Sequence, residues 1–172
     1  RFDLKKPQNM NGHYIREAED GRLAQLVAPQ LGGEATGEAG LALLTRAMPV
    51  LKPRAKDIAE LAAGAAFLFV QRPLPISEKA AALLDDTART LLGAIADRLR
   101  DNAVWTTEGL ETDLKSLAEE KGLGLGKLAQ PLRAALTGQT TSPGIFDVLA
   151  LLGRAESLAR IDDQAANGHI QA

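Results

Sequence analysis

The apolar residues of this chain are mostly leucine and alanine, and they recur at helical spacing. Leu125, Leu128, Leu132 and Leu136 follow one another at intervals of three and four residues, which places them on one face of a helix. Valine and isoleucine are sparse and do not alternate with polar residues, and aromatic residues make up 3% of the chain. Because leucine and alanine favour helices whereas β-branched residues favour strands, the sequence predicts an all-α protein.

We expect two consecutive small helical subdomains. Residues 71–75 contain two prolines and cannot be helical throughout, so they mark the boundary region. The division predicted is a leading segment over 1–16, a first helical subdomain over 17–76, a second over 77–163, and a disordered tail over 164–172. The predicted helices cover residues 12–31, 37–51, 56–69, 77–101, 105–121, 126–136, 143–152 and 156–161. Gly21 and Pro29 are expected to interrupt the first.

Two of the predicted helix ends bear on function. Gly138 ends the leucine-rich helix, and Ser142 and Pro143 are typical of the N-cap and first position of the next. A helix beginning there would present free backbone N–H groups, which suit a phosphate or a base acceptor. Arg133 lies at the edge of the leucine stripe, one position beyond Leu132.

Composition excludes several classes of site. The chain has no cysteine, which excludes disulfides and thiolate metal sites and fits a cytoplasmic protein. No apolar run approaches the roughly 20 residues that cross a bilayer, so we expect no membrane segment. The first residue is arginine rather than methionine, which indicates a fragment or a processed piece. Net charge is −2, but between Lys115 and Phe146 four basic residues face two acidic ones, a local excess that permits RNA binding.

The residues give no support for catalysis or for metal binding. Gly122 and Gly126 enclose only three residues and a leucine follows Lys127, so the pattern is not a phosphate-binding loop. The two histidines, His13 and His169, stand at opposite ends of the chain, with no second ligand at metal-binding spacing. Adjacent acidic pairs diverge by about 100° on a helix and cannot share a substrate.

Six short segments along the chain form recognisable motifs: residues 11–16 (NGHYIR), 51–54 (LKPR), 75–80 (PISEKA), 130–138 (QPLRAALTG), 142–146 (SPGIF) and 149–154 (LALLGR). In the same order, they resemble segments of the C-terminal, anticodon-binding region of the bacterial glutamyl-tRNA synthetase family. Any one of them is weak, but six in order are hard to produce by chance. The resemblance spans residues 2–158.

The resemblance implies a set of RNA-binding residues. It places Arg54 on the arginine that reads the third anticodon base, and Arg133 near the first two bases. It places Thr141, Ser142, Pro143 and Phe146 on the loop that splays and stacks those bases, and it makes Tyr14, Arg16 and Lys127 weaker candidates. Residues 1–16 would end the region that contacts the tRNA stem. From the residues alone, Arg54 can equally be a surface arginine, Arg133 a partner of Glu119 or Glu120, and Phe146 a core residue.

The resemblance also implies a larger enzyme. That enzyme activates glutamate with ATP and Mg²⁺ and charges tRNA(Glu), possibly also tRNA(Gln), through an N-terminal part whose signature sequences are absent here. We therefore expect this chain to bind tRNA as a monomer, without a cofactor of its own, and to catalyse nothing. A helical protein-interaction domain that uses its Leu and Ala faces is the alternative. A DNA-binding helix-turn-helix is disfavoured, because no recognition helix rich in Arg, Asn or Gln follows residues 137–143.

Overall fold

The computed structural model describes residues 12–165. Those residues form α-helices and short 3-10 helices and contain no strand, which confirms the all-α prediction. They divide between two compact units, with the boundary between Val70 and Gln71. Each unit has its own apolar core, built mainly from leucine and alanine.

Within residues 12–70, the first unit contains four α-helices and three short 3-10 turns. They are α1 (Gly12–Glu17), α2 (Asp20–Leu31), α3 (Glu38–Leu51) and α4 (Ile58–Ala65), with η2 (Gly33–Thr36), η3 (Lys52–Arg54) and η4 (Ala66–Leu68). Helix α2 packs against both α3 and α4. Gly40 lets α3 approach η2, because a Cβ atom at this position would lie 2.0 Å from the carbonyl oxygen of Glu34.

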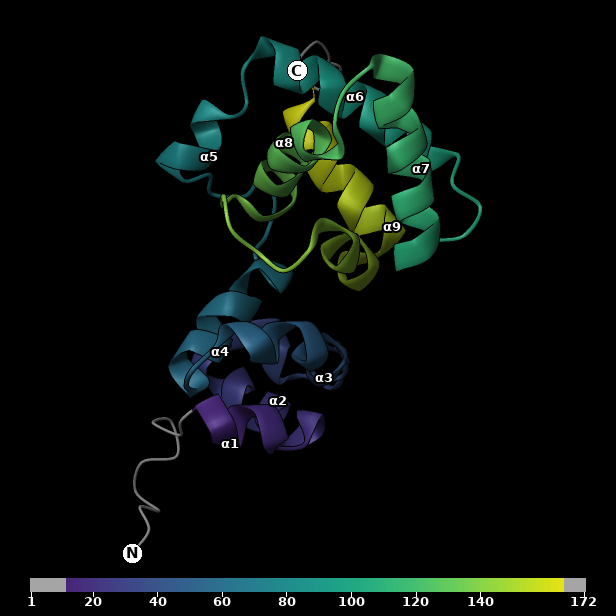
Figure 1. Ribbon diagram of the computed structural model, residues 1–172. Coiled ribbons are helices and arrows are strands. Elements are labelled where there is room, and N and C mark those ends of the chain that lie inside the picture. Colours follow the sequence, from purple (N-terminus) through teal and green to yellow (C-terminus); the bar gives the residue numbers. More distant parts are fainter. Residues whose placement is uncertain (1–11, 166–172) are drawn as a thin grey trace, which may run out of the picture. The chain divides into compact units, whose positions relative to one another are not determined.

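The second unit is built around its last helix. It contains α5 (Glu78–Ala82), α6 (Asp86–Arg100), α7 (Thr107–Lys121), α8 (Leu125–Thr137) and α9 (Ile145–Gln164). Helix α9, yellow in Figure 1, packs against α6, α7 and α8. Helix α9 thus connects these three helices.

A break at Gly153 divides α9 into two helical segments. Gly153 has φ 83° and ψ 168°, which no helical residue adopts. The carbonyl of Leu149, four residues earlier, accepts hydrogen bonds from the indole Nε1 of Trp105 (2.8 Å) and from the hydroxyl of Ser157 (3.4 Å). Side-chain donors from before α7 and from the second segment of α9 thus meet at one carbonyl beside the break.

Two long predicted helices are interrupted in the structure. The helix predicted over 12–31 is divided into α1 and α2 by Ala18 and Glu19, whereas Gly21 and Pro29 lie inside α2 without ending it. The helix predicted over 77–101 is divided into α5 and α6, because the carboxylate of Asp85 accepts from the backbone N–H of Ala88 (2.9 Å) and starts a new helix there.

Other predicted ends agree closely. Helix α8 begins and ends one residue outside its predicted limits, and Gly122 adopts the expected left-handed cap at the end of α7, with φ 67°. Helix α9 continues to Gln164, and Ala165 is buried, so these two residues do not belong to the disordered tail predicted over 164–172. The rest of that tail, and His169 with it, lies outside the described residues, as do residues 1–11.

The segment before α5 packs against the end of α8. The backbone N–H of Ser77 donates to the carbonyl of Gly138 (2.9 Å), and a Cβ atom at Gly138 would lie 2.2 Å from the carbonyl oxygen of Pro75. Residues 71–75 are non-helical as predicted. From the sequence, residues 71–76 were expected in the first subdomain, but they pack in the second unit. The functional limits of the subdomains stay a prediction.

Within residues 12–165, no helix combines the length and the apolar character needed to cross a bilayer.

Replacing Gly138 by alanine tests this close packing. Gly138 and Gly122 both have positive φ (76° and 67°), but nothing lies within 4 Å of a Cβ atom at Gly122. We expect Gly122→Ala to cost about 1–2 kcal/mol of unfolding free energy, the cost of a left-handed residue with a side chain. Gly138→Ala should cost a further 1–3 kcal/mol or so, because the methyl group must displace Pro75.

Urea unfolding followed by the fluorescence of Trp105 measures both variants, because it is the single tryptophan of the chain and belongs to the second unit. Equal losses for the two alanine variants would show that Gly138 and Pro75 are not packed together in solution.

Candidate functional site

The connection between α8 and α9, residues 138–144, is held in shape from the end of α8. The hydroxyl of Thr137 donates to the carbonyl of Arg133 (2.8 Å) and accepts from the backbone N–H of Gln139 (3.1 Å). Gly138 then turns the chain in the left-handed conformation. Gln139 and Thr141 are exposed after this turn, so the fixed backbone presents polar side chains to solvent.

Arg133 and Ser142 are joined across this loop. The Nε of Arg133 donates to the hydroxyl of Ser142 (2.8 Å), and that hydroxyl donates to the carbonyl of Pro143 (2.7 Å). Both side chains are half-buried, whereas Pro143 is buried. The predicted N-cap is therefore wrong, because the Ser142 hydroxyl bonds to an arginine and a carbonyl rather than to a helix N–H.

Helix α9 begins later than predicted. It starts at Ile145, with Gly144 as its N-cap and with no side-chain cap. Pro143 is a buried anchor of the loop rather than the first helical residue. Phe146 lies in the first turn of α9 and is half-buried, a position compatible with both a core role and a base-stacking role.

Arginine side chains in the second unit bond to the protein itself. All seven arginines between residues 71 and 165 make hydrogen bonds within the unit. They are Arg72, Arg89, Arg98, Arg100, Arg133, Arg154 and Arg160. Four of them, Arg72, Arg98, Arg100 and Arg160, pair with carboxylates, which balance their charge. Arg89, Arg133 and Arg154 donate to neutral groups.

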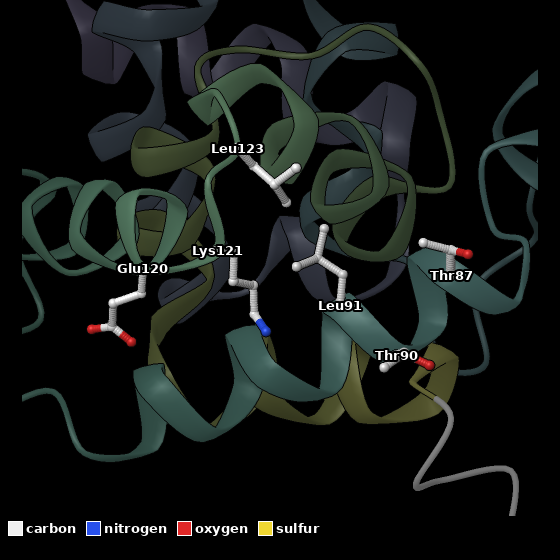
Figure 2. Close-up of a pocket in the computed structure, with 6 residues that line it drawn as sticks. All are labelled: Thr87, Thr90, Leu91, Glu120, Lys121 and Leu123. Carbon is white, nitrogen blue, oxygen red and sulfur yellow. The ribbon is translucent and has the colours of Figure 1, made fainter.

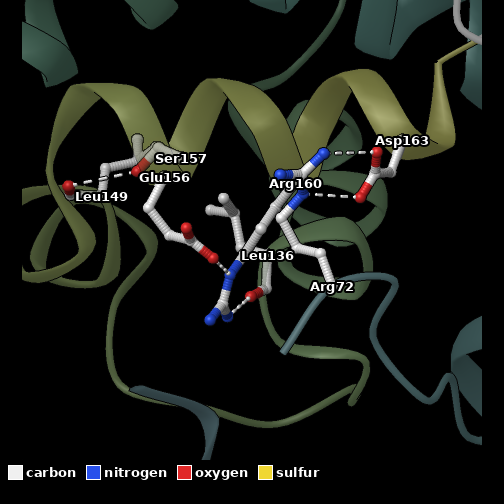
Figure 3. A network of polar contacts seen from close by, with 7 residues as sticks. All are labelled: Arg72, Leu136, Leu149, Glu156, Ser157, Arg160 and Asp163. Atoms are coloured by element: carbon white, nitrogen blue, oxygen red, sulfur yellow. Dashed lines mark hydrogen bonds and ion pairs between the residues drawn. The ribbon is translucent and has the colours of Figure 1, made fainter. Parts of the chain in front are cut away.

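Arg160 is the most buried of these arginines. Its side chain is 1% exposed; Nη1 donates to the carbonyl of Leu136 (2.7 Å) and Nε to the carboxylate of Glu156 (2.8 Å) (Figure 3). Leu136 lies in the last turn of α8, where carbonyls lack helical partners and the helix dipole is negative. Arg160 thus fastens α9 to the end of α8 immediately before the loop, a role that the sequence did not indicate.

The end of α9 is held by ion pairs with two further arginines. Arg72 makes two hydrogen bonds to Asp163, at 2.8 and 3.0 Å (Figure 3), and Arg100 binds Asp162 at 2.9 Å. The hydrogen bond that Arg72 donates to Asp163 raises the pKa of Arg72, and the one that Arg100 donates to Asp162 raises the pKa of Arg100. Both arginines therefore keep their charge, but as exposed pairs they contribute little to stability.

In the first unit, Arg54 is at the exposed end of η3, after Pro53. It makes no hydrogen bond or ion pair within the part of the chain that the structure describes. Arg16 is also exposed, and its Nη1 lies 3.3 Å from the position that a Cβ atom would take at Gly12. The same position is 3.9 Å from the carbonyl of Ala55, so Arg16 lies in the corner where α1 meets the end of η3.

The structure thus brings some predicted residues together within each unit. Arg133, Ser142 and Pro143 meet at the α8–α9 loop, where Thr141 is exposed. Arg54 and Arg16 lie in the corner between α1 and η3, and Tyr14 is half-buried on α1. Lys127 is exposed near the start of α8 and is about 9 Å along the helix axis from Arg133, at 1.5 Å per residue.

A solvent-facing pocket lies elsewhere on the second unit. It has a volume of about 590 Å³ and is lined by Thr87, Thr90 and Leu91 of α6 and by Glu120, Lys121 and Leu123 at the end of α7 (Figure 2). Glu120 already accepts two hydrogen bonds from Arg98, both at 2.7 Å. Among residues 12–165 no group of three His, Cys, Asp or Glu side chains could hold a metal ion.

Comparison with known proteins agrees with the fold and with the resemblance seen in the sequence. A family described as an anticodon binding domain matches residues 22–165. The curated glutamate–tRNA ligase 2 of Novosphingobium aromaticivorans is 68% identical over 169 residues, which are 96% of this chain and 35% of that protein. Glutamate–tRNA ligase 2 of Rhizorhabdus wittichii is 59% identical over 167 residues, which are 95% of this chain and again 35% of that protein.

Solved structures are similar as well. A glutamate–tRNA synthetase from Elizabethkingia anophelis superposes with a TM-score of 0.69 at 25% identity, over 100% of this chain and 32% of that chain. A glutamate tRNA ligase from Elizabethkingia meningosepticum gives 0.75 at 23% identity, over 90% of this chain and 30% of that one, a likeness of fold. The chain spans about a third of the length of the relatives it matches.

Ser142→Ala tests whether the Arg133–Ser142 bond fixes the loop. The change removes one acceptor and one donor, so we expect unfolding free energy to fall by about 0.5–1.5 kcal/mol. Thr141→Ala, at the exposed neighbouring position, should stay within about 0.5 kcal/mol of the parent. Denaturant unfolding followed by Trp105 fluorescence measures both; equal stability of the two variants would mean that the bond does not hold the loop.

Proposed function

This chain belongs to the anticodon-binding domain family, and from that premise we propose that it reads the anticodon of tRNA(Glu) within a longer glutamate–tRNA ligase. The observation that carries the proposal is the Arg133–Ser142 junction at the α8–α9 loop. It places a guanidinium, hydroxyl groups and a fixed backbone at one exposed connection. Unpaired bases are recognised by such groups, which bond to base edges and phosphates in a set geometry.

Arg54 supplies the second contact in this proposal. Its guanidinium has five N–H donors and is exposed without a partner among the described residues. A guanidinium can bond in two places to a base edge with the right acceptors and leaves donors unsatisfied against a wrong base. Arg54 is therefore proposed to read the third anticodon base, and Arg133, with residues 141–143 and Phe146, the first two.

The remaining candidate residues are proposed to contact the RNA without reading the anticodon bases. Arg16, near Arg54, and Tyr14 are proposed to touch the inner side of the tRNA, and Lys127 to contact phosphate. Such contacts add affinity that falls as salt rises, because each one releases counterions. They do not distinguish one anticodon from another.

The chemistry of charging is assigned to the part of the enzyme that this chain does not cover. We propose that the longer protein uses ATP and Mg²⁺, works in the cytoplasm, and acts as a monomer on tRNA(Glu). Whether the longer protein also accepts tRNA(Gln) is a separate question. An arginine at position 54 favours a protein that rejects tRNA(Gln). Contacts at the anticodon would hold the tRNA so that its acceptor end reaches the distant active site, a coupling between separated sites.

A protein-interaction domain is less well supported. Among the described residues, the large apolar side chains that are exposed are Val104 and Leu123. One precedes α7 and the other follows it, so the length of that helix separates them. An apolar groove for a partner helix would need a contiguous patch instead.

The proposal is tested by titrating the chain with tRNA(Glu) and with the same tRNA carrying a scrambled anticodon, at several salt concentrations. We expect tighter binding of the unaltered tRNA at every salt concentration, and weaker binding of both as salt rises. Equal affinity for the two RNAs would reject anticodon recognition. Affinity for neither, with salt-insensitive capture of a helical protein, would favour the interaction domain.

Arg54→Ala should weaken discrimination at the third anticodon position by roughly 1–3 kcal/mol, the range for loss of a base-specific arginine contact. The measurement is the ratio of dissociation constants for tRNA with an altered third base and for unaltered tRNA. Arg46→Ala removes an equally exposed positive charge from α3 and should leave this ratio unchanged. An unchanged ratio in Arg54→Ala would remove Arg54 from the base-reading site.

Arg133→Ala should weaken binding of the correct anticodon more than binding of a tRNA altered at the first two bases. Both RNAs are measured against the same variant, so a smaller folded fraction lowers both apparent affinities by the same factor. This matters because Arg133 also bonds to Ser142. Parallel losses for the two RNAs would restrict Arg133 to phosphate contact or to a structural role.

A further inference from the structure

We propose that Lys52 is a positioning residue for Arg54, because it fastens the η3 turn to the junction between α1 and α2. The proposal rests on the proposed function, since it concerns how the residue assigned to the third anticodon base is held. Lys52 itself does not contact RNA in this proposal.

The ammonium group of Lys52 lies between two negative groups. Its Nζ donates to the carbonyl of Ala18 and to Oδ1 of Asp20, both at 3.0 Å. Ala18 follows the last residue of α1, where the helix dipole is negative, and Asp20 opens α2. The Lys52 side chain is only 15% exposed and that of Asp20 34%. Loss of one partner would therefore leave a largely buried charge unbalanced.

The backbone around Arg54 is held on both sides. Leu51 and Ala55 are buried in the core of the unit, and the N–H of Ala55 donates to the carbonyl of Lys52 (3.2 Å). Between them only Pro53 and Arg54 are exposed, and the ring of Pro53 fixes its own φ. Since Lys52 is the first residue of this single turn, a shift of Lys52 moves the Cα of Arg54 directly.

The same contact also holds α1 in place. Gly12, at the start of α1, approaches Ala55 and Lys56, and Arg16 lies beside Gly12. Lys52 ties the other end of α1 to η3 through Ala18. Its ammonium thus fixes the corner from which both Arg16 and Arg54 project.

Lys52→Met tests this role, with Lys56→Met as the matched control. Methionine keeps an unbranched apolar side chain, one atom shorter than that of lysine, and removes the charge. The Lys56 side chain is exposed, two residues beyond Arg54, and its ammonium makes no hydrogen bond or ion pair within residues 12–165. The measurement is the same ratio of dissociation constants for tRNA with an altered and an unaltered third anticodon base, with circular dichroism to follow folding.

We expect Lys52→Met to lower this ratio roughly tenfold, since small misplacements of a recognition group cost one to two orders of magnitude. Lys56→Met should leave the ratio unchanged. In the Arg54→Ala background, Lys52→Met should have no further effect on the ratio, because it acts through Arg54. Lys52→Arg keeps donors for both acceptors and should restore discrimination, and Asp20→Asn should lower it by less than Lys52→Met does.

The outcomes separate this inference from the proposed function. If the parent chain discriminates and Arg54→Ala loses discrimination, but folded Lys52→Met and Asp20→Asn both keep the parent ratio, the positioning role is wrong and the function stands. If Lys52→Met lowers the ratio equally with and without Arg54, Lys52 acts independently and the inference is again wrong. A parent chain that does not distinguish the two RNAs would overturn the proposed function and this inference with it.

Discussion

The carbonyl groups at the C-terminal ends of the helices are the constraint on which this structure depends. The last turn of any α-helix leaves carbonyls without backbone partners, and a buried end must find donors elsewhere. Here, long basic side chains supply them. Arg154 donates to Leu99 and Asn102 at the end of α6, Arg160 to Leu136 near the end of α8, and Arg89 to Gln164 at the end of α9.

Several of these side chains come from α9 or bind to it, so the helix connects the second unit as much by polar bonds as by its apolar face. Arg154 follows the break at Gly153 and stacks over Trp105, with its guanidinium carbon 4.9 Å from the ring centroid. Trp105 in turn donates to Leu149 before the break. Arg154 and Arg160 both follow the break, so the second segment of α9 binds the ends of both α6 and α8, whereas the first segment is tied to Trp105 through Leu149.

Local patterns in the sequence predicted the helices well where local forces decide them. The leucine stripe of α8 and the glycine cap of α7 are examples, because the spacing of apolar side chains and the left-handed glycine act within a few residues. The cap at Asp85 is also a local signal, but the helix predicted over 77–101 ran through it. By contrast, the break before α2 coincides with the Lys52 contacts, made from 32 and 34 residues away, and the Ser142 hydroxyl bonds to an arginine nine residues earlier. Such tertiary contacts leave no periodic trace. The candidate RNA-binding residues came from family resemblance, and their roles stay predictions.

The internal use of arginine has a consequence for the proposed selectivity among RNAs. The chain has net charge −2, and four arginines of the second unit pair with carboxylates, so it generates little long-range attraction for polyanions. In the proposed function, random transcripts would therefore be held only briefly. Retention would depend on short-range fit, which lets a small surface sort among many chemically similar competitors.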